Sequence, residues 1–280
     1  MVLTRKQKMI KLVVTLVIAV LALLFIAPLM WMISSSLKAN YEVFASPFQW
    51  IPDKIQWANY KQVWLDAKVT MLHSYANTLK IVAISVAGNL AIASLAAYAF
   101  AKINFNGKHI IFLIFLSSMM IPSQVTIIPR FMLFKTMGLY NSRLAIILPT
   151  LFNATAIFML RQFYMGLPND LMEAAKIDGA GHFRIFAQIM LPLTKSALVS
   201  LMILSFISVW NEYLSPLIFL TKENLYTVAQ CIRWWMLDES GTSHAYAMAA
   251  ATSAVIPVII LFIACQKYFV EGIVTSGVKG

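Results

Sequence analysis

The chain has 280 residues, of which 60% are hydrophobic and only 12% charged, whereas a soluble domain carries roughly a quarter charged residues. Water is therefore not its main solvent. The formal net charge of +11 does not indicate nucleic-acid binding, because the basic residues stand singly at the ends of apolar runs. Those runs are about 20 residues long, as membrane-spanning helices are, and not the roughly ten residues of a barrel strand.

The apolar runs predict an all-α integral membrane protein with six transmembrane helices in a single domain, 1–280. The first run follows four basic residues, is too long for a signal-peptide core and lacks a small-residue cleavage site, so we expect it to remain as a span. The predicted spans are Leu12 to Ile33, Asn77 to Ala101, His109 to Pro129, Arg143 to Phe163, Ser196 to Leu220 and His244 to Lys267.

Basic flanks predict the orientation, because loops rich in lysine and arginine tend to stay cytoplasmic. Four basic residues between Arg5 and Lys11 precede the first span, against Lys38 alone just after it. The N-terminus is therefore predicted to be cytoplasmic, and six spans return the C-terminus to the same side. Loop 164–195 should then face the cytoplasm and loop 34–76 the outside. The basic turn after the third span disagrees, but the first flank usually dominates.

The third span contains two prolines, Pro122 and Pro129, each of which lacks a backbone donor and tends to kink or break a helix. In a membrane such breaks persist where they line a cavity or pack against protein. Gln124, beside the first proline, is a candidate residue of a substrate pathway. A packed kink without function is the alternative.

The fifth span contains Glu212, and an acidic side chain at the bilayer centre costs about 2.5 to 3.5 kcal/mol on insertion scales. We therefore expect it to face protein or water. With Trp210, Asn211 and Tyr213 it is suited to hydrogen-bond and stack on a sugar in the outer half of a pathway. A polar clamp against a partner subunit explains the same residues equally well.

Loop 164–195 has the signals of two short helices. Pro168 with Asn169 or Asp170 is a helix start, the residues up to Ile177 are mostly good helix formers, and Gly179 is a stop. A second short helix is expected before Pro192. A free helix of about two turns is marginal in water, so packing must hold the first one.

The first of these helices has a surface suited to docking. Ala174 and Ala175 let another surface approach the backbone, and Glu173 and Asp178 offer acceptors for basic residues on that surface. The sequence resembles the EAA loop of permease subunits in bacterial ABC importers, in which Glu-Ala-Ala precedes Asp-Gly-Ala and then Ile-x-Leu-Pro. The matching positions are Glu173, Ala174, Ala175, Asp178, Gly179, Ala180, Ile189, Leu191 and Pro192.

Nine positions over twenty residues make this resemblance specific, and the alternative is an amphipathic connector resting on lipid headgroups. The family's short helix is the coupling helix, which seats in a groove of the ATP-binding subunit. The resemblance thus implies that 173–175 and 178–180 couple the permease to an ATPase, and it implies a type I importer permease fold.

The resemblance covers nearly the whole chain and narrows to carbohydrate importers, the permeases similar to the maltose importer's smaller subunit. One departure is Ser196, where many relatives have a proline, and this affects only the start of the fifth span. The resemblance implies a second permease, two ATP-binding subunits and an extracytoplasmic sugar-binding protein in a bacterial plasma membrane. The stretches that carry it are Ala96–Lys102, Met120–Pro129, Trp210–Pro216 and Tyr268–Gly280.

Other chemistry is not indicated. The chain has no Gly-x-x-x-x-Gly-Lys-Ser/Thr loop, so ATP and magnesium are expected on partner subunits, with no cofactor, metal or catalytic residue on this chain. Its four histidines are dispersed, and its two cysteines have no metal-ligand spacing. One rival is an ion-driven transporter, but Glu212 is the only acid well inside a span, and no inverted repeat is apparent. An intramembrane enzyme would need a catalytic pair within the spans, and none is apparent.

Overall fold

The computed structural model describes residues 4–47, 49–237 and 243–277, with side chains up to residue 266. Within these ranges the backbone is helical and holds no strand, so the all-α class is confirmed. The C-terminal stretch of the family resemblance, 268–280, lies outside the described side chains. The helices are α1 (Arg5–Ser36), α2 (Ala58–Trp64), α3 (Met71–Lys102), α4 (Lys108–Ser118), α5 (Ile127–Thr136), α6 (Leu144–Leu151), α7 (Ala154–Met165), α8 (Asp170–Ile177), α9 (His182–Ile185), α10 (Leu191–Leu193), α11 (Lys195–Trp210), α12 (Leu214–Phe219), α13 (Val228–Met236) and α14 (His244–Gly277).

Backbone packing divides the chain into two compact units. Unit 1 comprises Met1–Met71 and Cys231–Ile256, and unit 2 comprises Leu72–Gln230 and Pro257–Gly280. The predicted single domain, 1–280, stays a prediction. Loop 164–195 and the predicted pathway residues, Gln124 and Trp210 to Tyr213, all lie within unit 2.

Four of the six predicted spans coincide with single long apolar helices. In the fifth, Lys195–Trp210 is long enough to cross a membrane only together with His182–Leu193, from which it is bent by 78°. The third is interrupted, so the count of six continuous spans is not exact. The helices long and apolar enough by themselves are Arg5–Ser36, Met71–Lys102, Leu144–Met165 and His244–Gln266.

The third predicted span is broken, as its prolines suggested. α4 ends at Ser118, and turns carry the chain to Ile127, where α5 begins. Pro122 lies in this break. Pro129 is the third residue of α5, where a helix has no partner for the amide that proline lacks, so it is accommodated there.

Unit 1 contains an ordered segment between its first helix and Met71. The Asn59 amide nitrogen donates to the carbonyl oxygens of Ser36 and Lys38, both at 2.9 Å. The hydroxyls of Ser36 and Tyr60 lie 2.7 Å apart. These bonds tie α2 back onto the end of α1, so the predicted loop 34–76 is in large part folded structure.

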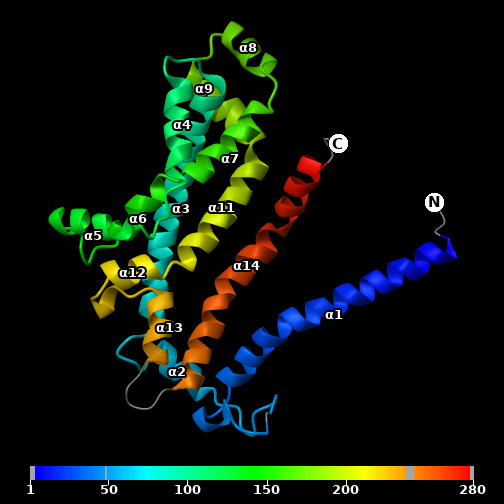
Figure 1. The fold of residues 1–280 in the computed structure, drawn as a ribbon, viewed down its shortest axis with the longest axis vertical. Helices are drawn as coiled ribbons and strands as arrows, with labels where there is room; N and C mark the ends of the chain where they lie inside the picture. Colours follow the sequence, from blue (N-terminus) through cyan, green and yellow to red (C-terminus); the bar gives the residue numbers. More distant parts are fainter. Residues whose placement is uncertain (1–3, 48, 238–242, 278–280) are drawn as a thin grey trace. The chain divides into compact units, whose positions relative to one another are not determined.

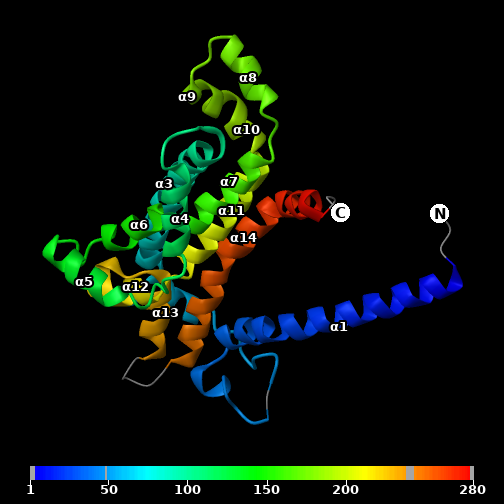
Figure 2. The ribbon, with the colours of Figure 1, turned by 45° about the horizontal axis from the view of Figure 1, so that its top comes forward.

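In unit 2, α3, α4, α7 and α11 run alongside one another, and α8 and α9 lie beyond one end of them (Figures 1 and 2). Small side chains permit this approach. Ala93 and Ala97 of α3 are fully buried, and a Cβ placed on Gly88 would lie 2.5 Å from Leu151 Cδ2. The aromatic rings of Tyr98 and Tyr164 fill the core nearest α8.

Candidate functional site

The loop after α7 folds into the two helices that the sequence predicted, joined by a glycine bend. α8 starts directly after Asn169, and Gly179 has φ +76°, the left-handed conformation that glycine adopts without steric cost. The Ala180 amide donates to the Ala175 carbonyl at 2.9 Å, which closes the end of α8.

The second helix is longer than predicted. It begins at His182, passes through a π-helical stretch, Phe186–Met190, and continues to Leu193. The prediction that it ends before Pro192 is wrong. Pro192 stands in the first turn of α10, and the wider π turn before it accommodates a residue without an amide donor.

α8 is held by one face and exposes the other. Met172 and Ala175 are buried in the core that contains Tyr164, Ile185 and Met190. The opposite face exposes a mixed surface of apolar, small and charged side chains. It consists of Glu173, Ala174, Lys176, Ile177, Asp178 and Gly179.

The predicted coupling residues thus divide between two surfaces. Glu173, Ala174, Asp178 and Gly179 are exposed, Ala180 is half-buried, and Ala175 is only 8% exposed. The prediction that Ala175 faces an approaching partner is wrong for this conformation, because positions three apart on a helix share a face and Ala175 shares its face with Met172. Ile177 is 86% exposed and adds an apolar side chain to this surface that was not predicted from the sequence.

A lysine connects the end of α3 to the start of α8. Lys102 Nζ donates to the Leu167 carbonyl at 2.7 Å and to Asn169 Oδ1 at 2.6 Å. The Asn169 side chain makes no capping bond to α8, and it accepts from the lysine instead. This contact places the turn after α3 beside loop 164–195.

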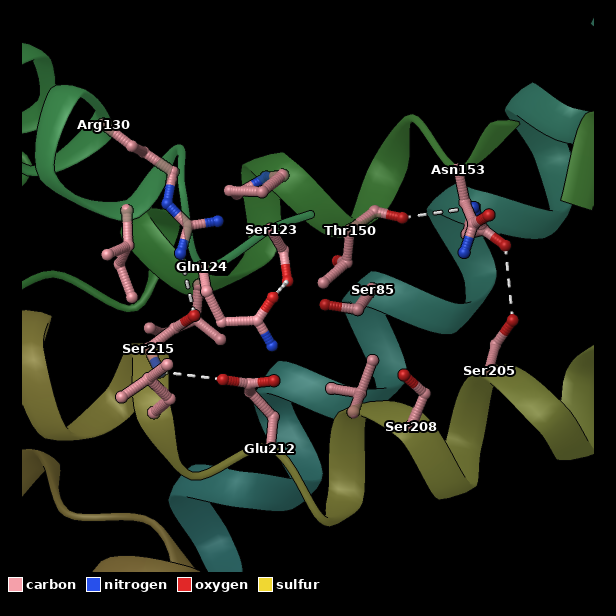
Figure 3. Close-up of a pocket in the computed structure, with 16 residues that line it drawn as sticks. Ser85, Ser123, Gln124, Arg130, Thr150, Asn153, Ser205, Ser208, Glu212 and Ser215 are labelled. Carbon is pink, nitrogen blue, oxygen red and sulfur yellow. Dashed lines mark hydrogen bonds between the residues drawn. The ribbon is translucent and has the colours of Figure 1, made fainter. Parts of the chain in front are cut away.

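A polar cavity of about 290 Å³ lies within unit 2, among α3, the α4–α5 break, α6 and the α11–α12 break (Figure 3). Most of its described lining residues are polar, and only Arg130 and Glu212 among them carry a charge. The lining consists of Ser85, Asn89, Ser123, Gln124, Ile127, Arg130, Ile146, Pro149, Thr150, Asn153, Ser205, Ser208, Val209, Glu212, Leu214 and Ser215.

The two charged residues are fixed through one serine. Glu212 Oε1 accepts the Ser215 backbone amide at 2.7 Å, and Arg130 Nη2 donates to Ser215 Oγ at 2.9 Å (Figure 3). The Arg130 guanidinium also lies over the Phe219 ring, 5.3 Å from its centroid. Glu212 therefore stabilises the start of α12 within the break of the fifth span, and Arg130 joins α5 to that break.

Of the predicted pathway residues, the structure brings Gln124 and Glu212 together at this cavity. Trp210, Asn211 and Tyr213 are not among its described lining residues. Trp210 is 3% exposed and stacks on Phe206, with ring centroids 5.6 Å apart. The Asn211 amide donates back to a backbone carbonyl of α11, and Tyr213 precedes α12.

Most polar residues of the cavity were not predicted, although the sequence contains a signal for them. The signal is a spacing of three or four residues, which places polar side chains on one face of a helix. It is present in α3 at Ser85 and Asn89, and in the fifth span at Ser205, Ser208 and Glu212. The same periodicity turns Trp210 away from that face. Arg130 had no comparable signal, because it lies on α5, after the break that follows α4.

Comparison with solved structures identifies the fold. The crystal structure of a bacterial ABC transporter involved in the import of the acidic polysaccharide alginate contains a chain that matches with a TM-score of 0.84 and 25% identity. The match covers 96% of this chain and 99% of that one. Together with the helix–glycine–helix loop, it defines a permease subunit of the type I ABC importer fold.

The chain belongs to the family described as "binding-protein-dependent transport system inner membrane component", whose model matches residues 88–274. The sn-glycerol-3-phosphate transport system permease protein UgpE of Pectobacterium atrosepticum is 33% identical, with coverage of 94% of this chain and 95% of that protein. The arabinooligosaccharides transport system permease protein AraQ of Bacillus subtilis is 31% identical and covers 96% of each chain. Membership explains the long apolar helices and establishes a multi-pass membrane protein.

Proposed function

We propose that this chain is a permease subunit of an ATP-driven importer that moves a sugar or oligosaccharide into the cytoplasm by alternating access. The observation that carries the proposal is the exposed face of α8. A short helix, buried on one side and presenting Glu173, Ile177 and Asp178 on the other, is suited to seat in another protein. Ile177 is 86% exposed although it belongs to a loop expected in water, which favours a protein partner.

The coupling follows from how α8 is attached. Lys102 joins it to α3, and Met172 and Ala175 join it to the core that α7 and α11 share. A push on α8 is therefore transmitted to several spans at once. ATP binding and hydrolysis in partner subunits shift the permease between inward-facing and outward-facing states only if those subunits bind the two states with different affinity. α8 is the surface through which this difference acts.

The partners follow from the same proposal. A second permease completes the pathway, two ATP-binding subunits hold ATP and magnesium, and an extracytoplasmic binding protein delivers the sugar. No catalytic step is assigned to this chain. The loop that contains α8 lies in the cytoplasm, with both termini on that side of a bacterial plasma membrane.

The pathway is proposed to pass the polar cavity, with Gln124 and Glu212 in its wall. Trp210, Asn211 and Tyr213 remain proposed pathway residues of the same segment. A sugar is favoured as cargo because one relative is named for arabinooligosaccharides and the structural neighbour is involved in the import of the acidic polysaccharide alginate.

The test is uptake by the complex in lipid vesicles. The chain, its co-purifying permease and ATP-binding subunits are reconstituted, and labelled sugar is supplied with the cognate binding protein. Uptake should require ATP and should cease when the ATP-binding subunits are left out. Uptake that continues without them under a proton or sodium gradient would contradict the proposal and support an ion-driven transporter.

A further inference from the structure

We infer that the cavity bounded by Arg130 and Glu212 is itself a binding site on this subunit for an uncharged polyhydroxylated ring, and that it disfavours anionic sugars. The inference deepens the proposed function and rests on it for the identity of the cargo. It assigns a ligand class to the cavity and a selectivity role to its two charged residues.

Unused hydrogen-bonding groups are the first observation. Ser85 is fully buried, lines the cavity, and its hydroxyl has no hydrogen-bond partner in the described part of the chain. A buried polar group left without a partner is costly, and a ligand hydroxyl is a suitable partner. The Arg130 Nε is likewise buried without a partner among the described residues.

Bracing by neighbouring residues is the second observation. Asn89 donates to the Thr150 carbonyl at 3.1 Å and accepts from Ser205 Oγ at 3.3 Å, so α3, α6 and α11 are joined across one wall. Asn153 uses its side-chain oxygen to accept the Ala156 amide at 3.1 Å, which leaves its amide nitrogen for a ligand. The cavity thus has a fixed wall and a set of available groups.

The available groups combine donors with acceptors. The Ser208 hydroxyl and the second carboxylate oxygen of Glu212 accept, whereas Arg130 and the amide nitrogens of Gln124 and Asn153 donate. A sugar hydroxyl both donates and accepts, so it satisfies either kind. An anion is best matched by an excess of donors and a cation by an excess of oxygen acceptors, so this mixture favours a hydroxylated ligand.

Charge distinguishes neutral from anionic rings. Arg130 and Glu212 are the only charged residues of the described lining and are opposite in sign, so the cavity has no net charge to offset the desolvation of an ionised ligand. Because both are fixed to Ser215, neither swings away easily. A carboxylate or phosphate attracted by Arg130 also meets the Glu212 carboxylate.

Protection of a cysteine from alkylation tests the inference on the full chain in lipid nanodiscs, without the ATP-binding subunits. The reporter is Ser208→Cys in a Cys265→Ser background, in which the one native cysteine that remains, Cys231, is buried. The signal of the same chain without the reporter is subtracted as background. The neutral probes are D-glucose, L-arabinose and maltose, and the anionic probes are D-glucuronate and glycerol 3-phosphate. Each is used at about 100 mM, because a transit site needs only weak, millimolar binding.

We expect at least one neutral sugar to slow alkylation severalfold, and both anions to protect about tenfold less well, the ratio that corresponds to about 1.4 kcal/mol. Adding Glu212→Gln should raise protection by D-glucuronate, whereas the matched change Asp170→Asn, outside the cavity, should not. Protection by an anion equal to that by the neutral sugars would overturn the inference, as would no protection by any neutral sugar.

The chain with Ser208→Cys alone is enough to detect equal protection by an anion or the absence of protection by neutral sugars, even if Glu212→Gln fails to fold. Failure of ATP-dependent uptake would overturn the proposed function and leave the protection measurement standing. The two proposals can therefore fail separately.

Discussion

Lys102 Nζ lies 2.6 Å from Asn169 Oδ1, and this contact attaches the start of α8 to the end of α3. The same ammonium donates to the Leu167 carbonyl at 2.7 Å. One side chain thus holds the entry to the proposed coupling helix, at a point where the helix has no side-chain cap of its own. A change here should weaken coupling without touching the exposed face.

Lys102→Met should loosen α8. Hydrogen bonds to a charged group contribute about 1.5 to 3 kcal/mol, and because this lysine is half-buried we expect a local loss of about 1 to 2 kcal/mol. Amide hydrogen exchange in 170–177 should then accelerate about 5- to 30-fold. The control is Lys195→Met, an exposed lysine at the start of α11. Equal exchange in both variants would contradict the tethering role.

Gly179 and Gly181 offer a matched pair. A Cβ added at either position would meet no atom within 4 Å, but Gly179 has φ +76° whereas Gly181 has φ −72°. Gly179→Ser should destabilise the bend by about 1 to 2 kcal/mol, because side chains disfavour the left-handed region. Gly181→Ser should be neutral or stabilising, since serine is a preferred N-cap residue and Gly181 is the N-cap of α9. Thermal unfolding of the two variants measures the difference.

Met172 and Ile177 separate folding from docking. Met172 is 4% exposed, so Met172→Ala should cost about 2 to 5 kcal/mol of stability through the cavity it leaves. Ile177 is 86% exposed, so Ile177→Ser should leave stability unchanged within about 0.5 kcal/mol. It should nevertheless reduce co-purification of the ATP-binding subunits. If Ile177→Ser lowered the melting temperature as much as Met172→Ala, α8 would be a structural element and not a docking surface.

The sequence predicted the coupling loop well because local chemistry determines it. A proline–asparagine start and a glycine stop define α8 whatever surrounds them, and the structure has both. The orientation of Ala175 was wrong because the core that buries it comes from distant parts of the chain. The helical periodicity of the fifth span places Glu212 on the face of Ser205 and Ser208 and Trp210 on another face, so it could have shown that only Glu212 lines the cavity.

The cavity could be predicted only in part for the same reason. Gln124 and Glu212 were chosen because each is polar within an apolar run, and both line the cavity. Arg130 reaches it because the third predicted span stops at Ser118 and a new helix, α5, begins after the break. Where α5 lies depends on packing between segments far apart in sequence.

The most direct test of the central claim, that α8 transmits ATP-driven motion to this permease, is sugar uptake by the reconstituted complex that contains Glu173→Arg. Glu173 is exposed on α8, and reversing its charge should place a cation against the basic residues that we propose on the partner. We predict that ATP-driven uptake falls at least about tenfold, because mispairing a charge at an interface costs about 2 to 5 kcal/mol. The matched change Asp53→Arg, in an exposed loop of unit 1, should leave uptake unchanged. Normal uptake and normal assembly with Glu173→Arg would contradict the account.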